Sequence, residues 1–297
     1  MNVKTKFSII MANYNNGEYI GDAVNSILSQ THADWELLIC DDASTDNSVS
    51  KISKFLNDPR IKLFRNKVNK GIIHSENSLI KQCRSKYIGI LDSDDVLTSD
   101  AVSTMLDAHI SNPDTAFIYS QYEFCDSNLK FTSKGSSRAV PLNSSTLVDD
   151  CAVAFRTFKK SAALEIGLLD YAMKYAEDKD FIYKLEELAP IVFVDKVLYK
   201  YRIQDESSSH GDNEARARMI MSYARLEAYK RRLNTPISNL SKTSVGIEVM
   251  YGIGVSLRKL NFAQFKIFSL ALRDYDLNMV KNMGAFVRGI RGKMLWL

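Results

Sequence analysis

The sequence lacks several patterns that would place it directly in a familiar class of protein. Neither GxGxxG nor GxxxxGK[ST] is present, which excludes the standard dinucleotide-binding and P-loop motifs. No segment approaches the ~18 consecutive apolar residues that a membrane-spanning helix needs. Internal repeats and low-complexity tracts are also absent. The four cysteines are widely spaced and form no CxxC pair, which favours reduced, mostly buried thiols.

The N-terminus also lacks a secretion signal of ordinary length. Lys4 and Lys6 precede the apolar stretch Phe7–Ala12, which is shorter than a signal h-region and runs into polar residues. The hydrophobic content of 45% and the charged content of 25% are typical of a soluble globular protein. We therefore expect a cytoplasmic protein. Its 297 residues fit one large α/β domain with an appendage, or two modest domains.

Charge is distributed unevenly along the chain. Residues 1–210 hold 24 Lys and Arg against 29 Asp and Glu, a net −5, whereas residues 211–297 hold 15 against 6, a net +9. A basic segment attracts nucleic acid, anionic lipid or an acidic acceptor, and charge alone does not choose among these partners.

Short apolar runs alternate with helical patterns over the first 125 residues, which predicts βαβ units and a mostly parallel sheet. We expect strands at 7–12, 35–40, 61–64, 87–91 and 117–122, with helices at 18–30, 46–56, 72–83 and 99–109. The polar stretch from about 126 to 143 has no periodicity and is interpreted as a loop. Further on we expect helices at 160–166 and 177–188 and closing strands at 191–194 and 197–201.

From Glu214 onward the pattern becomes helical, with apolar residues on one face and basic residues available for others. We therefore expect two regions: an α/β catalytic domain over residues 1–210 and a basic, mainly helical appendage over residues 211–297. The last twelve residues, 286–297, mix apolar, aromatic and basic side chains. This composition suits either an anionic membrane surface or packing on the catalytic domain or on a second copy, and both alternatives stay open.

Three of the expected strands end in polar residues. The first is followed by Asn13-Tyr14-Asn15, the second by Asp41-Asp42 and the fourth by Asp92-Ser93-Asp94-Asp95. Because the carboxyl ends of parallel strands gather at one edge of a sheet, we expect one shared pocket there. Clustered carboxylates repel one another unless a cation compensates them, and hard oxygen ligands suit Mg²⁺ or Mn²⁺. The acidic strand end therefore predicts a divalent ion and a phosphorylated substrate.

These segments, taken in order, resemble the family 2 inverting glycosyltransferases, which have a GT-A type, Rossmann-like fold and bind nucleotide-sugars. The resemblance covers roughly residues 5–210. The segments that carry it are Ser8–Asn15, Ser26–Thr31, Asp41–Asp46, Asn69-Lys70-Gly71, Asp92-Ser93-Asp94, Ile166–Asp170, Glu177–Asp180 and Tyr201-Arg202.

The resemblance implies roles for individual residues of this chain. In the nucleobase pocket, Asp42 contacts the nucleobase, Tyr14 packs against the nucleobase and Ala12 contributes backbone atoms. Asp92 and Asp94 correspond to the DxD pair, with Asp94 as the direct metal ligand and Asp92 nearer the ribose or a metal-bound water. The Glu177-Asp178 pair is similar to the ED motif, in which the aspartate is the general base. The remaining substrate contacts that we expect are Lys70, Gly71, Ser93, Glu177 and Arg202.

The chain departs from the family pattern in two places. Many relatives have a histidine two residues after the arginine of the Tyr-Arg motif, whereas this chain has Gln204, with His210 as a loose substitute. The third metal ligand is therefore open. The Asn-x-Gly segment continues to Glu76 before Asn77, where relatives have a basic or apolar residue. Lys70 and Arg202 are therefore the better candidates for contacts with the diphosphate.

The function that the resemblance implies is transfer of one hexosyl or N-acetylhexosaminyl group from a nucleotide-sugar, UDP-linked, to a saccharide acceptor of a cell-surface glycan. The expected cofactor is Mn²⁺ or Mg²⁺. One alternative is transfer to a polyprenyl phosphate, which needs less deprotonation and weakens the case for Asp178. A second is a non-catalytic nucleotide-sugar-binding module, which the presence of Asp178 opposes. Nucleic-acid binding through the basic tail is a third alternative, which the acidic pocket opposes.

Overall fold

The computed structural model describes residues 6–203, 212–233, 235, 242–258, 262–274 and 286–287. The chain divides into two compact units. The first comprises Met1–Val140, Asp150–Leu169 and Leu188–Asp205, and the second comprises Pro141–Asp149, Asp170–Glu187 and Glu206–Leu297. One boundary lies close to the expected division at residue 210, but two earlier segments group with the C-terminal region. The segment that carries Glu177 and Asp178 is one of them.

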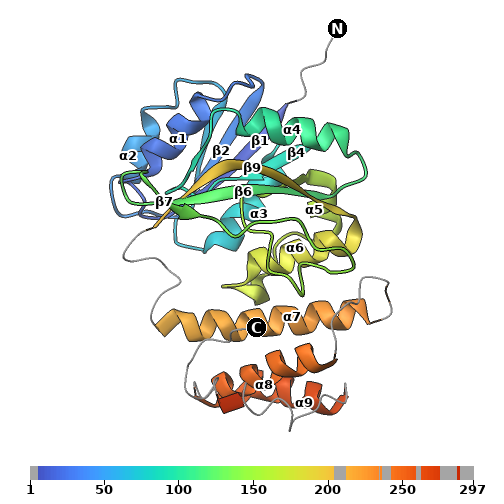
Figure 1. Cartoon of the computed structure of the whole chain (residues 1–297). Helices are drawn as coiled ribbons and strands as arrows, with labels where there is room; N and C mark the ends of the chain where they lie inside the picture. The colour runs from blue at the N-terminus through green and yellow to red at the C-terminus, as the bar shows by residue number, and fades with distance from the viewer. Residues whose placement is uncertain are drawn as a thin grey trace. The chain divides into compact units, whose positions relative to one another are not determined.

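The first unit is built on a nine-stranded sheet in the order β3-β2-β1-β4-β8-β6-β9-β5, with β7 paired to β6 (Figure 1). Its parallel half consists of β1 (Phe7–Asn13), β2 (Trp35–Asp41), β3 (Ile61–Arg65) and β4 (Tyr87–Ile90). Every residue of β2 and β4 is buried, which explains their almost unbroken apolar sequences. The βαβ alternation expected for the first 91 residues is confirmed.

The second half of the sheet mixes strand directions. It consists of β5 (Val96–Leu97), β6 (Phe117–Cys125), β7 (Phe131–Lys134), β8 (Thr157–Lys159) and β9 (Ile191–Arg202). The short strand β8 pairs antiparallel with both β4 and β6, whereas β9 runs parallel to β6. Since β9 also pairs with β5, it brings its C-terminal residues next to the chain that leaves β4.

Helices cover the sheet of the first unit: α1 (Ile20–Leu28), α2 (Ser48–Ser53), α3 (Ile72–Gln82), α4 (Ala101–Ser111) and α5 (Lys160–Glu165). The apolar positions of α1 recur at helical spacing, and Ile20, Val24 and Ile27 are fully buried. They join one core with Ile9 and Leu37 of the sheet, so burial of this stripe fixes α1 on the strands whose ends form the site.

Two local expectations are wrong. The segment 126–143, interpreted as a loop, contains β7, a strand whose four residues are all exposed. Hydrophobic periodicity does not predict such a strand, because it buries neither face. The two closing strands expected at 191–194 and 197–201 form a single strand, β9, with register shifts near Gln121 of its partner β6. The polar residues Asp195 and Lys196 interrupt the apolar pattern at an irregularity within one strand.

The second unit contains the 3₁₀ turn η1 (Tyr171–Met173) and the helices α6 (Glu177–Leu188), α7 (Asp212–Arg232), α8 (Lys242–Arg258) and α9 (Phe262–Asp274). The last three share an apolar core that includes Leu226, Val249 and Phe268, which confirms the expected helical C-terminal part. Among the helices described here, none is both long and apolar enough to cross a membrane. Gln204, His210 and residues 288–297 lie outside the described residues.

His109 gives the first unit a pH-dependent stability. Its ring is fully buried, stacks on Tyr87 and contacts the Thr157 hydroxyl at 3.0 Å through Nε2. Burial, followed by the charges of Lys159 and Lys86, lowers the pKa of His109 to about 3 from its usual 6.5. The folded protein therefore keeps this histidine neutral, whereas the unfolded chain takes up a proton below pH 6.5. Above pH 6.5 the histidine is neutral in both states and does not reduce the free energy of unfolding. As the pH falls from 6.5 toward 3, His109 lowers the free energy of unfolding by about 1.4 kcal/mol per pH unit.

We therefore expect His109→Gln to flatten the acid side of the stability profile. Urea unfolding at pH 7 and pH 5 measures the loss of unfolding free energy for wild type and variant, and the carboxylates common to both cancel in the comparison. The control is His32→Gln, which replaces a partly exposed histidine of the same unit. If the wild type and His109→Gln lost the same free energy between the two pH values, the neutral buried histidine would not account for acid sensitivity.

Candidate active site at the carboxyl ends of β1, β2 and β4

The ends of β1 and β2 lie side by side because Asn13 pairs with Asp41 in the parallel register. The Asn13 side-chain amide donates to Asp41 Oδ1 at 2.9 Å and to Ser44 Oγ at 3.1 Å, so the two strand ends are also joined by their side chains. Ala12 is the partly buried residue before Asn13, and Tyr14 follows with 47% of its surface exposed. An aromatic ring held at a strand end with this exposure presents a flat surface to a ligand.

Asp42 is buried and acts as an anchor for the loop between β3 and α3. Its Oδ1 accepts from the Asn66 amide at 2.7 Å and from the Lys70 backbone N–H at 2.9 Å. Its Oδ2 accepts from the backbone N–H of Gly71 at 2.7 Å. Gly71 has φ +87°, a conformation that favours glycine. Asp42, Lys70 and Gly71, expected from the sequence to share a site, are therefore brought together through direct hydrogen bonds.

The loop after β1 also reaches the acidic end of β4. The Asn16 side-chain amide donates to Ser93 Oγ at 2.8 Å, and Ser93 is buried. The three polar strand ends thus gather at one edge of the sheet, as expected for parallel strands. The contact gives Ser93 a structural role between Asp92 and Asp94.

Asp95 has a different environment from the two aspartates before it. It is 2% exposed, and it accepts from the Tyr199 hydroxyl at 2.7 Å through Oδ2 and from the Arg202 backbone N–H at 2.7 Å through Oδ1. Burial, with the nearby charges of Asp92 and Asp94, raises its pKa well above the usual range. Asp95 therefore ties the end of β4 to β9.

Asp92 and Asp94, the two aspartates before Asp95, are partly buried. Asp92 Oδ2 lies 3.4 Å from the Arg156 guanidinium and accepts from the Tyr199 hydroxyl at 3.2 Å. Burial, and then the negative charge of Asp92, raise the pKa of Asp94 to about 6. Asp94 is thus held where its ionised form is unfavourable, and a bound cation would relieve this cost.

This environment fits a divalent metal ion. Across the described residues, no three His, Cys, Asp or Glu side chains group together as a metal site. Mg²⁺ in sites that bind phosphates is commonly held by one or two protein carboxylates, with substrate phosphates and water as the other ligands. The Asp92 and Asp94 pair meets this requirement without a third protein ligand. Gln204 and His210, considered from the sequence for that position, lie outside the described residues.

Arg202 is held by groups of the protein in this structure. Its side chain is 2% exposed. Nε donates to the Asp94 carbonyl at 2.7 Å, one terminal nitrogen donates to Asp22 Oδ2 at 2.9 Å, and the other contacts the Ser127 carbonyl. The guanidinium also lies over the Tyr19 ring at 4.5 Å from its centroid. These contacts fix the backbone of Asp94, and a direct contact of Arg202 with a diphosphate stays a prediction.

Glu177 and Asp178 lie in the second unit, in the first turn of α6. Glu177 Oε2 accepts from the backbone N–H of Tyr175 at 2.7 Å, and Asp178 Oδ1 accepts from the backbone N–H of Lys179 at 2.8 Å. Carboxylates in a first helical turn are favoured by the helix dipole. The roles of Glu177 and Asp178 in a reaction stay predictions.

Three residues near the expected site were not identified from the sequence: Asn66 beside Asp42, and Arg156 and Tyr199 beside Asp92. Arg156 directly precedes β8 and Tyr199 lies within β9, so both residues are far along the chain from Asp92. An isolated arginine and a tyrosine in an apolar run give no periodic or motif signal. Their position depends on strand order, which the sequence does not specify.

The family model described as Glycosyl transferase family 2 matches residues 8–167. Chondroitin synthase from Escherichia coli is 33% identical over 205 residues, which are 68% of this chain and 29% of that protein. The UDP-Glc:alpha-D-GlcNAc-diphosphoundecaprenol beta-1,3-glucosyltransferase WfgD, also from Escherichia coli, is 38% identical over 121 residues, which are 41% of this chain and 47% of that protein. The chain therefore spans less than half the length of each of these relatives.

Among solved structures, residues 1–349 of Staphylococcus aureus TarS in complex with UDP resemble the present structure. The TM-score is 0.64 at 17% identity, and the match covers 98% of this chain and 93% of that one. At this level of identity the likeness concerns the fold. It confirms the expected GT-A type architecture with a C-terminal helical part.

Proposed function

The chain belongs to glycosyl transferase family 2, and on this premise we propose that it transfers one sugar from a UDP-sugar to a hydroxyl group of a saccharide acceptor. The observation that carries the proposal is the gathering of Asp42, Asp92 and Asp94 at one edge of the sheet, in segments that match the family. In this proposal, the edge of the sheet combines a site for the nucleobase of the donor with a site for its metal-bound diphosphate.

The comparisons support the choice of donor and acceptor class. WfgD is named for a UDP-Glc donor and an acceptor saccharide on diphosphoundecaprenol, and the TarS structure contains UDP. We propose a hexosyl or N-acetylhexosaminyl donor and an acceptor saccharide of a cell-surface glycan, carried on a lipid or a growing chain.

In the proposed complex Tyr14 stacks on the uracil, Asp42 and the backbone of Ala12 border it, and Lys70 approaches the diphosphate. Asp94 and Asp92 would hold Mn²⁺ or Mg²⁺. When bound, the ion supplies Lewis-acid stabilisation of the charge that develops on the departing diphosphate. Arg202 and Tyr199 keep the end of β4 in place through Asp94 and Asp95.

Asp178 serves in this proposal as the general base. Its carboxylate takes the proton of the acceptor hydroxyl while that oxygen forms a bond to the anomeric carbon on the face opposite the leaving group. The bond from the anomeric carbon to the phosphate oxygen breaks, and its electron pair leaves with UDP. One displacement inverts the configuration at the anomeric carbon, so no enzyme nucleophile is required.

A screen of the purified protein against a panel of nucleotide-sugars, with and without Mn²⁺, tests this function. We expect metal-dependent release of UDP from one or more UDP-sugars, slow with water and faster with a matching acceptor saccharide. Binding of a UDP-sugar with no turnover under any of these conditions would indicate a binding module. Release that is accelerated only by a polyprenyl phosphate would instead indicate that class of acceptor.

A further inference from the structure

Helix α6 carries acidic side chains at both ends. Its first turn contains Glu177, Asp178 and Asp180, and Glu186 and Glu187 lie in its last turn, which has no basic residue. Anions are stabilised at a helix N-terminus and destabilised at a C-terminus. The last turn of α6 therefore needs cations from another part of the chain.

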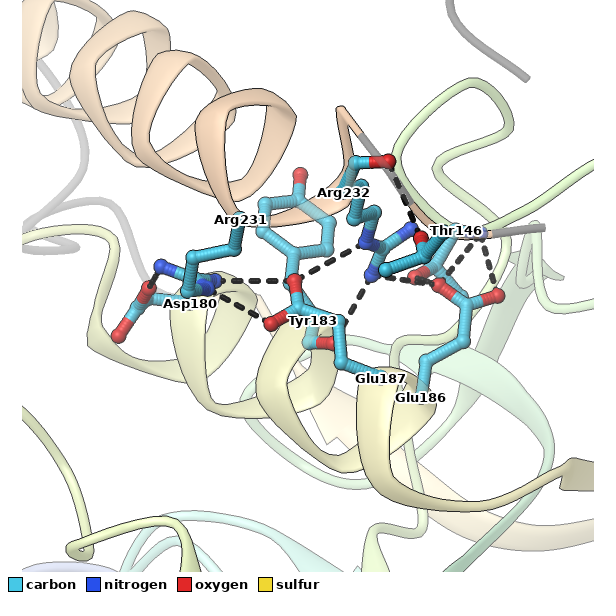
Figure 2. A network of polar contacts seen from close by, with 8 residues as sticks. Thr146, Asp180, Tyr183, Glu186, Glu187, Arg231 and Arg232 are labelled. Atoms are coloured by element: carbon cyan, nitrogen blue, oxygen red, sulfur yellow. Dashed lines mark hydrogen bonds and ion pairs between the residues drawn. The ribbon is translucent and has the colours of Figure 1, made fainter. Parts of the chain in front are cut away.

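Arg231, near the C-terminal end of α7, provides one of them. Its Nε donates to Glu187 Oε2 at 2.6 Å and one terminal nitrogen donates to Glu187 Oε1 at 3.1 Å, a two-point pairing that the planar guanidinium favours. Its other terminal nitrogen lies 3.4 Å from Asp180 Oδ1 (Figure 2). Since seven residues make about two helical turns, Asp180 and Glu187 share a face of α6 and Arg231 contacts both.

Arg232, the last residue of α7, contacts the same end of α6 from a buried position. Its side chain is fully buried, and it donates to Glu187 Oε1 at 2.9 Å, Glu186 Oε2 at 3.0 Å and the Tyr183 carbonyl at 2.8 Å. Glu186 also accepts from the Thr146 hydroxyl at 2.6 Å (Figure 2). Removing one member of such a buried network leaves an uncompensated charge. We therefore expect a change at Arg232 to destabilise the second unit strongly. Arg231, with 32% of its side chain exposed, is the better position for a substitution.

We propose that Arg231 is a positioning residue for sugar transfer, which fixes the helix that carries Asp178 through Asp180 and Glu187. The inference rests on the proposed function, because it takes Asp178 as the base. Asp180 lies two residues after Asp178 in the same first turn, so a displacement of the helix moves both. A misplacement of about 1 Å in a reacting group can lower a rate by about 100-fold. The positive charge of Arg231 on α7 thus stabilises the position of α6 within the same chain.

The test uses Arg231→Met in the full chain, with the UDP-sugar that the wild type turns over fastest. We expect kcat for UDP release to fall by about 10- to 100-fold, with KM for the donor and Kd for UDP within about twofold of wild type. Arg231→Lys should recover part of the loss, because an ammonium group still pairs with Glu187 but lacks the planar fork. Glu187→Gln should lower kcat too, and the double variant should lose less than the product of the two single effects.

Arg258→Met is the matched control, because it makes the same change at an exposed position of α8 in the same unit; we expect wild-type kcat. Circular dichroism and thermal melting verify folding of every variant, and if Arg231→Met does not fold, Arg231→Lys carries the comparison, because Glu187 also pairs with the buried Arg232. The inference would be overturned by a kcat of Arg231→Met within twofold of wild type. A loss of UDP affinity as large as the loss in kcat, or effects of Arg231 and Glu187 that are independent of each other, would also overturn it. If Asp178→Asn is inactive while Arg231→Met is normal, only the positioning role fails, whereas a fully active Asp178→Asn removes the proposed base itself.

Discussion

Replacement of Asp178 by asparagine is expected to lower sugar transfer by about 100- to 10,000-fold, the range that general-base assistance typically contributes. The amide has nearly the same shape as the carboxylate, and its oxygen can still accept the Lys179 N–H that Asp178 accepts at 2.8 Å. It cannot take up the proton of an acceptor hydroxyl. The residues proposed to bind UDP belong to the first unit, so UDP affinity should stay close to that of wild type.

Steady-state UDP release measures the rate for this variant, and isothermal titration with UDP and Mn²⁺ measures binding. Asp195→Asn is the matched control, because it makes the same chemical change at an exposed position of β9. Near-normal turnover of Asp178→Asn would exclude Asp178 as the base. If the physiological acceptor were a phosphate, which is already ionised, the variant would stay active with that acceptor and lose activity only with saccharide hydroxyls.

Replacement of Asp94 by asparagine is expected to lower metal-dependent turnover by about 100- to 1,000-fold, because Lewis-acid stabilisation is worth several kcal/mol and each 1.4 kcal/mol is tenfold in rate. The Mn²⁺ concentration needed for half-maximal UDP binding should rise. In the absence of metal, the melting temperature should stay the same or increase, since the change removes a partly buried negative charge that Asp92 repels. The stability measurement separates a metal-site effect from damage to the fold.

Asp107→Asn is the control for this experiment, because it removes an exposed carboxylate from α4 in the same unit. It should change neither the Mn²⁺ titration nor the rate. An Asp94→Asn variant with an unchanged Mn²⁺ requirement would show that the ion binds elsewhere in the chain. A large fall in melting temperature would show that Asp94 supports the fold more than it binds a ligand.

The parallel half of the sheet was predictable because its strands β2 and β4 are buried on both faces. Runs such as Trp35–Cys40, which is apolar except for Glu36, and Tyr87–Leu91 predict buried strands. The polar residues directly after them lie at the carboxyl edge once the strands are parallel. The antiparallel half was less predictable. The exposed strand β7 has no apolar face to mark it, and Asp195 and Lys196 divide the single strand β9 into two apparent strands.

The environment of each acidic residue was not predictable in the same way. The run Asp92-Ser93-Asp94-Asp95 presents three chemically equivalent carboxylates, yet Asp95 pairs with Tyr199 and the backbone of Arg202. The partners lie more than 100 residues away in the sequence. Only the placement of β9 in the sheet brings them to the end of β4. The motif predicts a diphosphate contact for Arg202, which stays a prediction, but it does not reveal that the guanidinium donates to the Asp94 carbonyl and to Asp22.

The sequence by itself determined the family, the alternation of strands and helices and the acidic strand ends, because each is encoded by residues close together in the chain. The tertiary structure alone decided which carboxylates are tied into the protein, and that α6 belongs with the basic helices rather than with the sheet. Charge composition showed an excess of cations after residue 210 but not their partners. Pairing of Arg231 and Arg232 with acids about 45 residues earlier requires two helices to pack side by side, and that packing is a property of the folded chain.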